Sequence, residues 1–158
     1  MKSAVYPGTF DPVTNGHLDL ITRALSVFDR VVVAVAKNPK KNPLFDINER
    51  VLLLQEVTKG IGNVEVVAFD TLTTQFCQEM GLNLLIRGLR AVSDFEYELQ
   101  MNQMNRKLNE SIETVFMMPG QEYTYISSGL IKEVASYGGD VSCLVPSAVC
   151  KALKTKFN

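Results

Sequence analysis

Residue types that mark certain chemistries are scarce in this chain. It has three cysteines, Cys77, Cys143 and Cys150. Their odd number and the lack of a C-x-x-C pair argue against a disulfide framework and against a cysteine zinc site. We therefore expect ordinary thiols in a reducing compartment. A single histidine, His17, is present, so any role for an imidazole falls to this one residue.

An excess of charge of one sign is also lacking. The 16 basic and 17 acidic residues give a formal net charge of −1, so no general basic field favours nucleic acid, and any binding of a polyanion must be local. No apolar run is long enough to span a bilayer, and the first residues lead directly into a strand. We expect a cytoplasmic protein, without nucleic-acid or membrane partners, folded as one domain over residues 1–158.

Short apolar runs alternate with amphipathic segments along the chain. The predicted strands are Ser3–Tyr6, Val31–Ala36, Val64–Ala68, Leu84–Ile86 and Thr114–Met117. The predicted helices cover residues 15–28, 47–59, 72–80, 93–108, 128–136 and 147–156. This order favours an α/β fold with a doubly wound, parallel, five-stranded sheet. The first four strands are short and rich in β-branched residues, which is typical of strands covered on both faces.

A sheet of this kind binds ligands at the carboxyl ends of its strands. Three polar segments are expected there: the loop after Tyr6, the lysine-rich loop after Ala36, and Arg87 after Ile86. The G-x-G-x-x-G sequence of dinucleotide-binding proteins is absent, so the glycine loop after the first strand needs another explanation.

That first loop carries the most information. The apolar run Ala4–Tyr6 enters a segment dense in glycine and proline, which ends at Thr14, a favourable helix N-cap. Apolar residues then recur at helical spacing, so His17 is expected in the first helical turn. Free backbone N–H groups and the positive end of the helix dipole meet there. A strand, a glycine loop and a helix N-terminus with a ring N–H donor predict a phosphate site.

The segment from Tyr6 to His17, Tyr-Pro-Gly-Thr-Phe-Asp-Pro-Val-Thr-Asn-Gly-His, resembles the first signature of the nucleotidyltransferase superfamily. Thr14 stands where many members have histidine, so the cytidylyl-transferring branch fits less well. The wording is most similar to that of the bacterial phosphopantetheine adenylyltransferase family. The resemblance implies the Rossmann-like nucleotidyltransferase fold.

A second block, Ile86-Arg87-Gly88-Leu89-Arg90, places two arginines at the end of a predicted strand. Arginine is always charged, and its planar fork fits phosphate oxygens. Gly88 would let the backbone approach a ligand closely. With the following Asp-Phe-Glu-Tyr-Glu, the block resembles the same family. The resemblance implies that Arg87 holds the phosphate of phosphopantetheine, that Arg90 contacts the nucleotide phosphates, and that Glu98 contacts the nucleotide.

A third block, Tyr123 to Lys132, contains Ser127-Ser128-Gly129 before a predicted helix. Either serine can cap that helix, which would create a second anion site. The block resembles the signature that opposes the first motif in the superfamily, where Ser128 matches the position that cradles the β- and γ-phosphates. Gly129 stands where some members have serine or threonine.

Two weaker matches complete the site implied by the resemblance. In the Lys37–Pro43 loop, Lys41 matches the lysine that neutralises charge at the reacting centre, and Lys40 is one residue away. Thr73 falls where the family lines the pantetheine arm. The expected catalytic residues are thus His17, Lys41 and Arg87, and the expected acceptor-binding residues are Thr9, Lys41, Thr73 and Arg87. The expected ATP-binding residues are Thr9, Phe10, His17, Gly88, Leu89, Arg90, Glu98, Tyr123, Thr124, Tyr125, Ile126, Ser127, Ser128 and Gly129.

The activity implied is transfer of AMP from ATP to 4′-phosphopantetheine, which gives dephospho-coenzyme A and pyrophosphate. The attacking phosphate is already anionic near neutral pH, so we expect catalysis by positioning and charge neutralisation without a general base. Mg²⁺ is expected to arrive with ATP and to ride on its phosphates, without a protein metal site. The resemblance also implies a homohexamer and coenzyme A as a feedback ligand.

Two other interpretations stay open at this stage. Another nucleotidyl transfer could use nicotinate mononucleotide or glycerol phosphate as acceptor, although the Asp-Phe-Glu-Tyr-Glu block speaks against both. A non-catalytic nucleotide sensor could use the same fold, although it would not need His17, Lys41 and Arg87 as transition-state donors.

Overall fold

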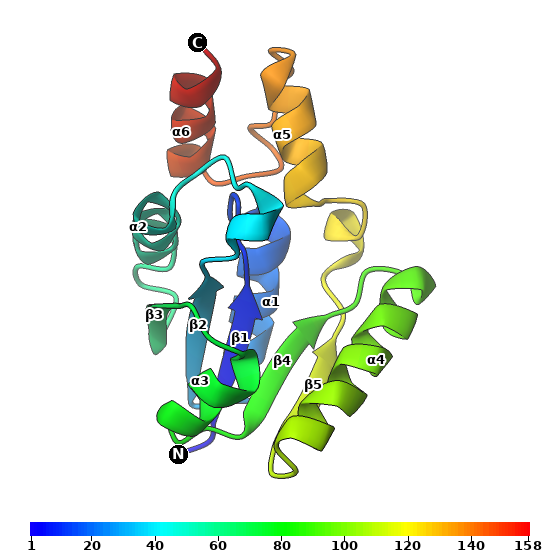
Figure 1. Ribbon diagram of the computed structural model, residues 1–158. Coiled ribbons are helices and arrows are strands. Elements are labelled where there is room, and N and C mark those ends of the chain that lie inside the picture. Colours follow the sequence, from blue (N-terminus) through cyan, green and yellow to red (C-terminus); the bar gives the residue numbers. More distant parts are fainter.

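The computed structural model describes residues 1–158, except for the side chains of residues 92 and 93 (Figure 1). The strands are β1 (Ser3–Gly8), β2 (Arg30–Ala36), β3 (Val64–Phe69), β4 (Leu84–Gly88) and β5 (Glu113–Met117). The helices are α1 (Asn15–Leu25), α2 (Ile47–Val57), α3 (Thr73–Glu79), α4 (Val92–Leu108), α5 (Ser128–Ser136) and α6 (Ser147–Phe157). Two short 3₁₀ turns, η1 (Pro39–Lys41) and η2 (Gln121–Tyr123), were not predicted.

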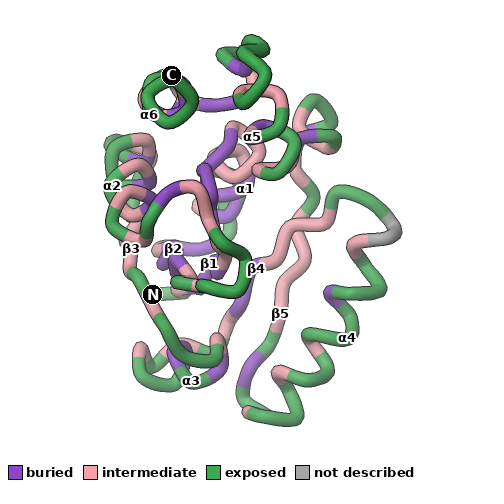
Figure 2. Tube along the Cα trace, turned by 45° about the horizontal axis from the view of Figure 1, so that its top comes forward, coloured by how far each residue is buried: buried purple, intermediate pink, exposed green. Residues whose placement is uncertain are grey.

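The five strands form one parallel sheet in the order β3-β2-β1-β4-β5. Helices cover both of its faces, so the predicted doubly wound α/β fold is confirmed (Figure 1). The larger core packs side chains of β1 and β2 against α1, α2, α5 and α6. The smaller core, on the other face, packs Val5, Val32 and Leu85 against Phe76 and Cys77 of α3. Buried residues gather along β1 and β2 (Figure 2).

Element boundaries differ from the predicted ones by a few residues. The helix predicted over 15–28 ends at Leu25, because the Ser26 N–H donates to the carbonyl of Arg23 and tightens the last turn. The helix predicted over 47–59 ends at Val57. β4 continues through Gly88, so Arg87 lies within the strand and not in the loop that follows.

β3 is an edge strand with a neighbour on one side only, and its residues are partly or fully exposed. Its side chains still pack on both faces, as expected for the first four strands: Val64 and Val66 lie against the larger core, and Val67 and Phe69 against the smaller one. The other edge strand is β5, beside which α4 runs (Figure 1). In the part of the chain that the structure describes, no helix has the length and apolarity needed to cross a membrane.

The sheet opens between β1 and β4. β1 pairs with β2 along its whole length, from Ser3 to Gly8, whereas its pairing with β4 is at Val5 and Leu85. Beyond that point the carboxyl ends of the two strands diverge. The chain also reverses its direction of winding here, since β2 and β3 lie on one side of β1 and β4 and β5 on the other. Parallel sheets bind ligands at such a switch point.

We predict that Leu54→Ala lowers the free energy of unfolding by about 2–5 kcal/mol. Leu54 of α2 is fully buried in the larger core, so truncation leaves a cavity. The matched control is Leu52→Ala in the same helix, because Leu52 is 64% exposed and should cost less than about 0.5 kcal/mol. Urea denaturation of both variants checks this. Equal losses would contradict the burial of Leu54 in this core.

Candidate active site

A cavity of about 740 Å³ lies at the carboxyl ends of the strands. Residues that follow each of the five strands contribute to its lining, among them Thr9, Lys41, Thr73, Arg90 and Pro119. The floor is formed by Tyr6 and Leu85, where β1 and β4 separate. The N-termini of α1 and α5 also line the cavity. Unpaired N–H groups at two helix starts therefore lie at one cavity, an arrangement suited to phosphates.

His17 is held by the capping box of α1. The Thr14 hydroxyl accepts from the His17 N–H at 3.3 Å, and the Thr14 N–H donates to His17 Nδ1 at 3.0 Å. Because Nδ1 accepts a backbone N–H, it carries no proton, and the neutral ring must carry its proton on Nε2. The ring also packs edge-on against Phe10, with centroids 5.0 Å apart. His17 is thereby fixed as a donor through Nε2.

The pKa of His17 is lowered from 6.5 to about 4. Desolvation by burial is the larger cause, and the positive charge of Arg90 adds to it. Burial is therefore the main reason that His17 is neutral. A neutral imidazole donates a hydrogen bond without acting as a proton shuttle near pH 7.

Arg87 is locked in place by three hydrogen bonds. Its Nε and Nη2 donate to the two carboxylate oxygens of Glu98, at 2.7 and 2.5 Å, and its Nη1 donates to the carbonyl of Pro7 at 3.0 Å. Glu98 is buried, whereas Arg87 is partly exposed and lines the cavity. A side-on ion pair leaves the end of the guanidinium fork available for another anion. Glu98 faces Arg87 in this structure, and its expected nucleotide contact stays a prediction.

Arg90 and the start of α5 line another part of the cavity. Arg90 Nη1 donates to the carbonyl of Ile126 at 3.0 Å, and Asp94 accepts from the Arg90 N–H. Ser127 is the N-cap of α5 and accepts from the Leu130 N–H. The Ser128 hydroxyl donates to the carbonyl of Pro12 at 2.7 Å and so joins α5 to the first motif loop. Of the two candidate caps, Ser127 is thus the one used.

The loop after β2 brings Lys41 to the cavity. Lys41 ends the turn η1, which is flanked by Asn38 and Asn42 in the left-handed conformation (φ of 43° and 45°). Asparagine tolerates this conformation better than most residues. Asn38 also donates to the hydroxyl of Thr9 at 3.4 Å. Lys41 lines the cavity with an exposed side chain, so its amine can reach a ligand there.

Most residues expected from the sequence lie at this cavity. All three expected catalytic residues line it, as do Thr9 and Thr73. Of the expected ATP contacts that the structure describes, Leu89, Thr124 and Tyr125 are not among the lining residues. Their roles, like those of the others, stay predictions. A Cβ at Gly88 would come within 2.8 Å of the end of the Leu20 side chain in α1, so close packing is a second reason for glycine at this position. The expected approach of a ligand to Gly88 stays a prediction.

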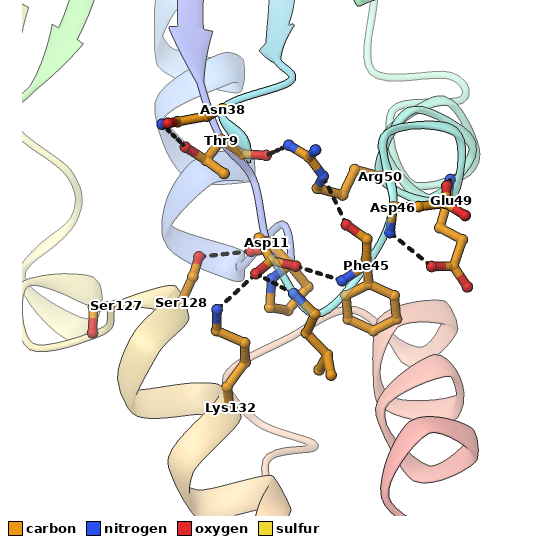
Figure 3. A network of polar contacts seen from close by, with 12 residues as sticks. Thr9, Asp11, Asn38, Phe45, Asp46, Glu49, Arg50, Ser127, Ser128 and Lys132 are labelled. Atoms are coloured by element: carbon orange, nitrogen blue, oxygen red, sulfur yellow. Dashed lines mark hydrogen bonds and ion pairs between the residues drawn. The ribbon is translucent and has the colours of Figure 1, made fainter. Parts of the chain in front are cut away.

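Sequence reasoning missed two buried charged residues beside the cavity, Asp11 and Arg50 (Figure 3). Arg50 donates to four main-chain carbonyls, those of Thr9, Ala36, Lys37 and Phe45. A signal for Arg50 was available: it occupies the apolar stripe of α2, three residues after Ile47 and four before Leu54. Asp11 lay within the first motif, but no role was expected for it.

A resident metal would need several ligands in one place. Among the described residues, no three or more His, Cys, Asp or Glu side chains gather where they could hold a metal ion.

The site lies at the switch point of a doubly wound sheet. It combines a neutral imidazole, an ion-paired arginine and two helix N-termini, which is typical of α/β proteins that bind nucleotides or other phosphates. Residues 5–134 match the model of the cytidylyltransferase-like family, and the chain belongs to that family. It is 53% identical to the phosphopantetheine adenylyltransferase of Lachnoclostridium phytofermentans over 158 residues, which is all of this chain and 97% of the relative.

Two solved structures share the fold. A putative nicotinate-nucleotide adenylyltransferase from Vibrio parahaemolyticus superposes with a TM-score of 0.74 at 19% identity, over 98% of this chain and 93% of the other. A lipopolysaccharide core biosynthesis protein from Thermoplasma volcanium superposes with a TM-score of 0.57 at 21% identity, over 74% of this chain and 96% of the other. At these identities the likeness supports the fold and not a shared substrate.

We predict that His17 titrates near pH 4 and stays neutral at pH 5 and above. Because the unfolded chain has a His pKa of about 6.5, it binds more protons than the folded chain between pH 6.5 and 4. The free energy of unfolding should therefore fall as the pH drops through that window. NMR titration of the only imidazole measures the pKa directly, and His17→Ala should remove this part of the pH dependence. A pKa at or above 6.5 would contradict the burial of the His17 ring.

Proposed function

We propose that this protein is a phosphopantetheine adenylyltransferase that transfers AMP from ATP to 4′-phosphopantetheine, giving dephospho-coenzyme A and pyrophosphate in coenzyme A biosynthesis. The proposal is supported by the 53% identity over the whole chain to a relative of that name. The single structural observation behind it is His17, fixed as a neutral Nε2 donor at a helix N-terminus in a cavity lined with cations.

In the proposed reaction, an oxygen of the acceptor phosphate attacks the α-phosphorus of ATP. A P–O bond forms there as the bond to the β-phosphate breaks, and pyrophosphate leaves. The acceptor phosphate is already anionic, so no residue has to take a proton from it. The chain's task is to bring two anions together and to neutralise the charge that develops.

The positions of five expected residues and of the start of α5 support a role for each in this reaction. Thr9 and the end of the Arg87 guanidinium hold the acceptor phosphate, and Lys41 reduces the repulsion between acceptor and ATP. His17 donates from Nε2 to an oxygen of the α-phosphate, most strongly in the transition state. Arg90 and the N–H groups at the start of α5 hold the leaving pyrophosphate. This role is supported by the hydrogen bond from Arg90 to Ile126, which keeps the arginine beside the start of α5 at the cavity.

Several finer features belong to the same proposal. Mg²⁺ arrives with ATP and is held by its phosphates, residues 1–158 act as one nucleotidyltransferase domain, and the protein works as a homohexamer with coenzyme A as a competing ligand. The cytoplasm stays the predicted location. Exposed apolar side chains on α4, among them Met104 and Leu108, are compatible with a subunit interface.

We expect pyrophosphate release on mixing the protein with ATP and 4′-phosphopantetheine, and almost none with pantetheine. Pantetheine lacks the phosphate that Thr9, Lys41 and Arg87 would anchor, and its hydroxyl would need a base that a neutral, Nε2-protonated His17 does not supply. Nicotinate mononucleotide and glycerol phosphate serve as alternative acceptors in the same assay. Activity with one of those instead would contradict the proposed acceptor. Nucleotide binding without turnover on any acceptor would indicate a sensor.

We expect His17→Ala to lower kcat by roughly 10²–10³-fold, since a donor that acts in the transition state is lost. The dissociation constant for ATP should change little by comparison. The control is Asn15→Ala in the same helical turn. The Asn15 side chain donates to the carbonyl of Cys143 and does not line the cavity, so its loss should leave kcat close to that of the wild type. Steady-state kinetics and ATP titration of folded variants separate the two quantities. A kcat near that of the wild type would rule out the role proposed for His17.

A further inference from the structure

The Asp11 carboxylate is the centre of a buried polar cluster beside the cavity (Figure 3). Its Oδ1 accepts from the Phe45 N–H at 2.9 Å, and its Oδ2 accepts from the Leu44 N–H at 2.9 Å. The same Oδ2 pairs with Lys132 Nζ at 2.6 Å. The carboxylate is thus fully engaged with the protein, and the side chain of Asp11 is 5% exposed.

Asp11 and its partners belong to three segments that the proposed function assigns to phosphate binding. Asp11 itself follows Thr9 by two residues, in the loop after β1. Leu44 and Phe45 end the loop that carries Lys41, and Lys132 lies on α5, one turn after Ser128. These segments are far apart in the sequence, and one carboxylate joins them.

The Lys41 loop has its other attachment at Arg50. The guanidinium of Arg50 donates to the carbonyls of Ala36 and Lys37 at the start of the loop and of Phe45 at its end. Arg50 and Asp11 therefore meet at Phe45, one at its carbonyl and one at its N–H. Between these anchors Lys41 is exposed, so its reach into the cavity is set by how the ends of the loop are held.

We propose that Asp11 is a positioning residue that delivers Lys41 to the reacting phosphates, with Lys132 as its counter-ion and not as a phosphate ligand. This inference rests on the proposed function. Two observations favour the counter-ion role. Lys132 Nζ lies 2.6 Å from Asp11 Oδ2. Without Lys132, only the N–H groups of Leu44 and Phe45 would compensate the negative charge of this buried carboxylate. Removing one partner of a buried ion pair leaves an uncompensated charge.

The first test is Asp11→Asn. The Leu44 and Phe45 N–H groups donate to different oxygens of the carboxylate. In an amide one of these two positions carries an NH₂ donor, so one of the two N–H groups loses its acceptor in this geometry. The Lys41 loop should loosen, and kcat/KM for 4′-phosphopantetheine should fall by about 100-fold, as expected for a misplacement of about 1 Å. The matched control is Asp46→Asn, which keeps an acceptor for the Glu49 N–H at the N-cap of α2. Wild-type kinetics in folded Asp11→Asn would overturn the proposal.

Combined variants distinguish a role of Asp11 through Lys41 from a role in stability alone. If Asp11 acts by delivering Lys41, then Lys41→Ala should cost much less in the Asp11→Asn protein than in the wild type, a further loss within about twofold. In the Asp46→Asn protein, Lys41→Ala should cost its full wild-type factor. Losses that multiply in both backgrounds would show that Asp11 does not act through Lys41.

Lys132→Met keeps the test decisive if Asp11→Asn does not fold. Without Lys132 the buried Asp11 carboxylate has no counter-ion. The attachment of the Lys41 loop should therefore weaken, and the cost of Lys41→Ala should fall. Lys132→Arg should restore activity, because the guanidinium can pair with the same carboxylate. A loss in Lys132→Met that multiplies with that of Lys41→Ala would instead mean that Lys132 binds phosphate directly, and would overturn its role as a counter-ion.

Hydrogen exchange of the Leu44 and Phe45 amides tests the attachment without any substrate. Both should be protected in the wild type and should exchange at least about tenfold faster in Lys132→Met, as expected for a locally opened segment. Wild-type turnover of 4′-phosphopantetheine is measured first. Absence of turnover would refute the proposed function. Unprotected Leu44 and Phe45 amides in an active wild-type protein would refute only the positioning role of Asp11.

Discussion

The parallel alignment of β1 between β2 and β4 is the constraint on which the remaining structure depends. Parallel strands bring all their carboxyl ends to one edge, so loops that are far apart in the sequence open onto the same cavity. β1 and β4 pair at Val5 and Leu85 and then part, which leaves room for a ligand between them. The same edge receives the N-termini of α1 and α5, whose free N–H groups suit anions.

Loops at such an edge are not held by the sheet, and in this protein buried charges hold them. Arg50 binds carbonyls on both sides of the Lys41 loop, and Asp11 binds its last N–H groups. Glu98 fixes Arg87 in the same way, through a side-on pair that leaves part of the fork available. A site that works by positioning two anions needs its cations fixed before the ligands arrive, because misplacement by about 1 Å can cost 10²-fold in rate.

His17 illustrates how local chemistry determines function. The capping box uses its Nδ1 as an acceptor, and burial beside Arg90 keeps the ring neutral. The proton is left on Nε2, where it can be donated to a phosphate oxygen. The residue that would serve as a base in many enzymes is fixed in this site as a hydrogen-bond donor, which agrees with an acceptor that is already ionised.

Local patterns predicted the elements well, because apolar periodicity and helix caps are properties of short segments. The strand run Val31–Ala36 and the Thr14 cap were both predicted and are both found, and so was the place of His17 in the first turn of α1. The resemblance of three motifs to one family supplied the residues that periodicity alone could not rank. The edge position of β3 was not predicted, since it depends on strand order. Asp11 and Arg50 were missed because their partners are main-chain groups far away in the sequence.

In the reaction proposed for this site, the adenylyl group passes directly from ATP to the acceptor phosphate, with the two anions held in line and without a covalent adenylyl-enzyme. The most direct measurement uses ATP made chiral at the α-phosphorus with sulfur and oxygen isotopes, and determines the configuration of the dephospho-coenzyme A formed. A single in-line displacement predicts inversion at phosphorus. Retention would require two displacements through an enzyme nucleophile, and would contradict the roles of His17, Lys41 and Arg87 as groups that only position the phosphates and neutralise their charge.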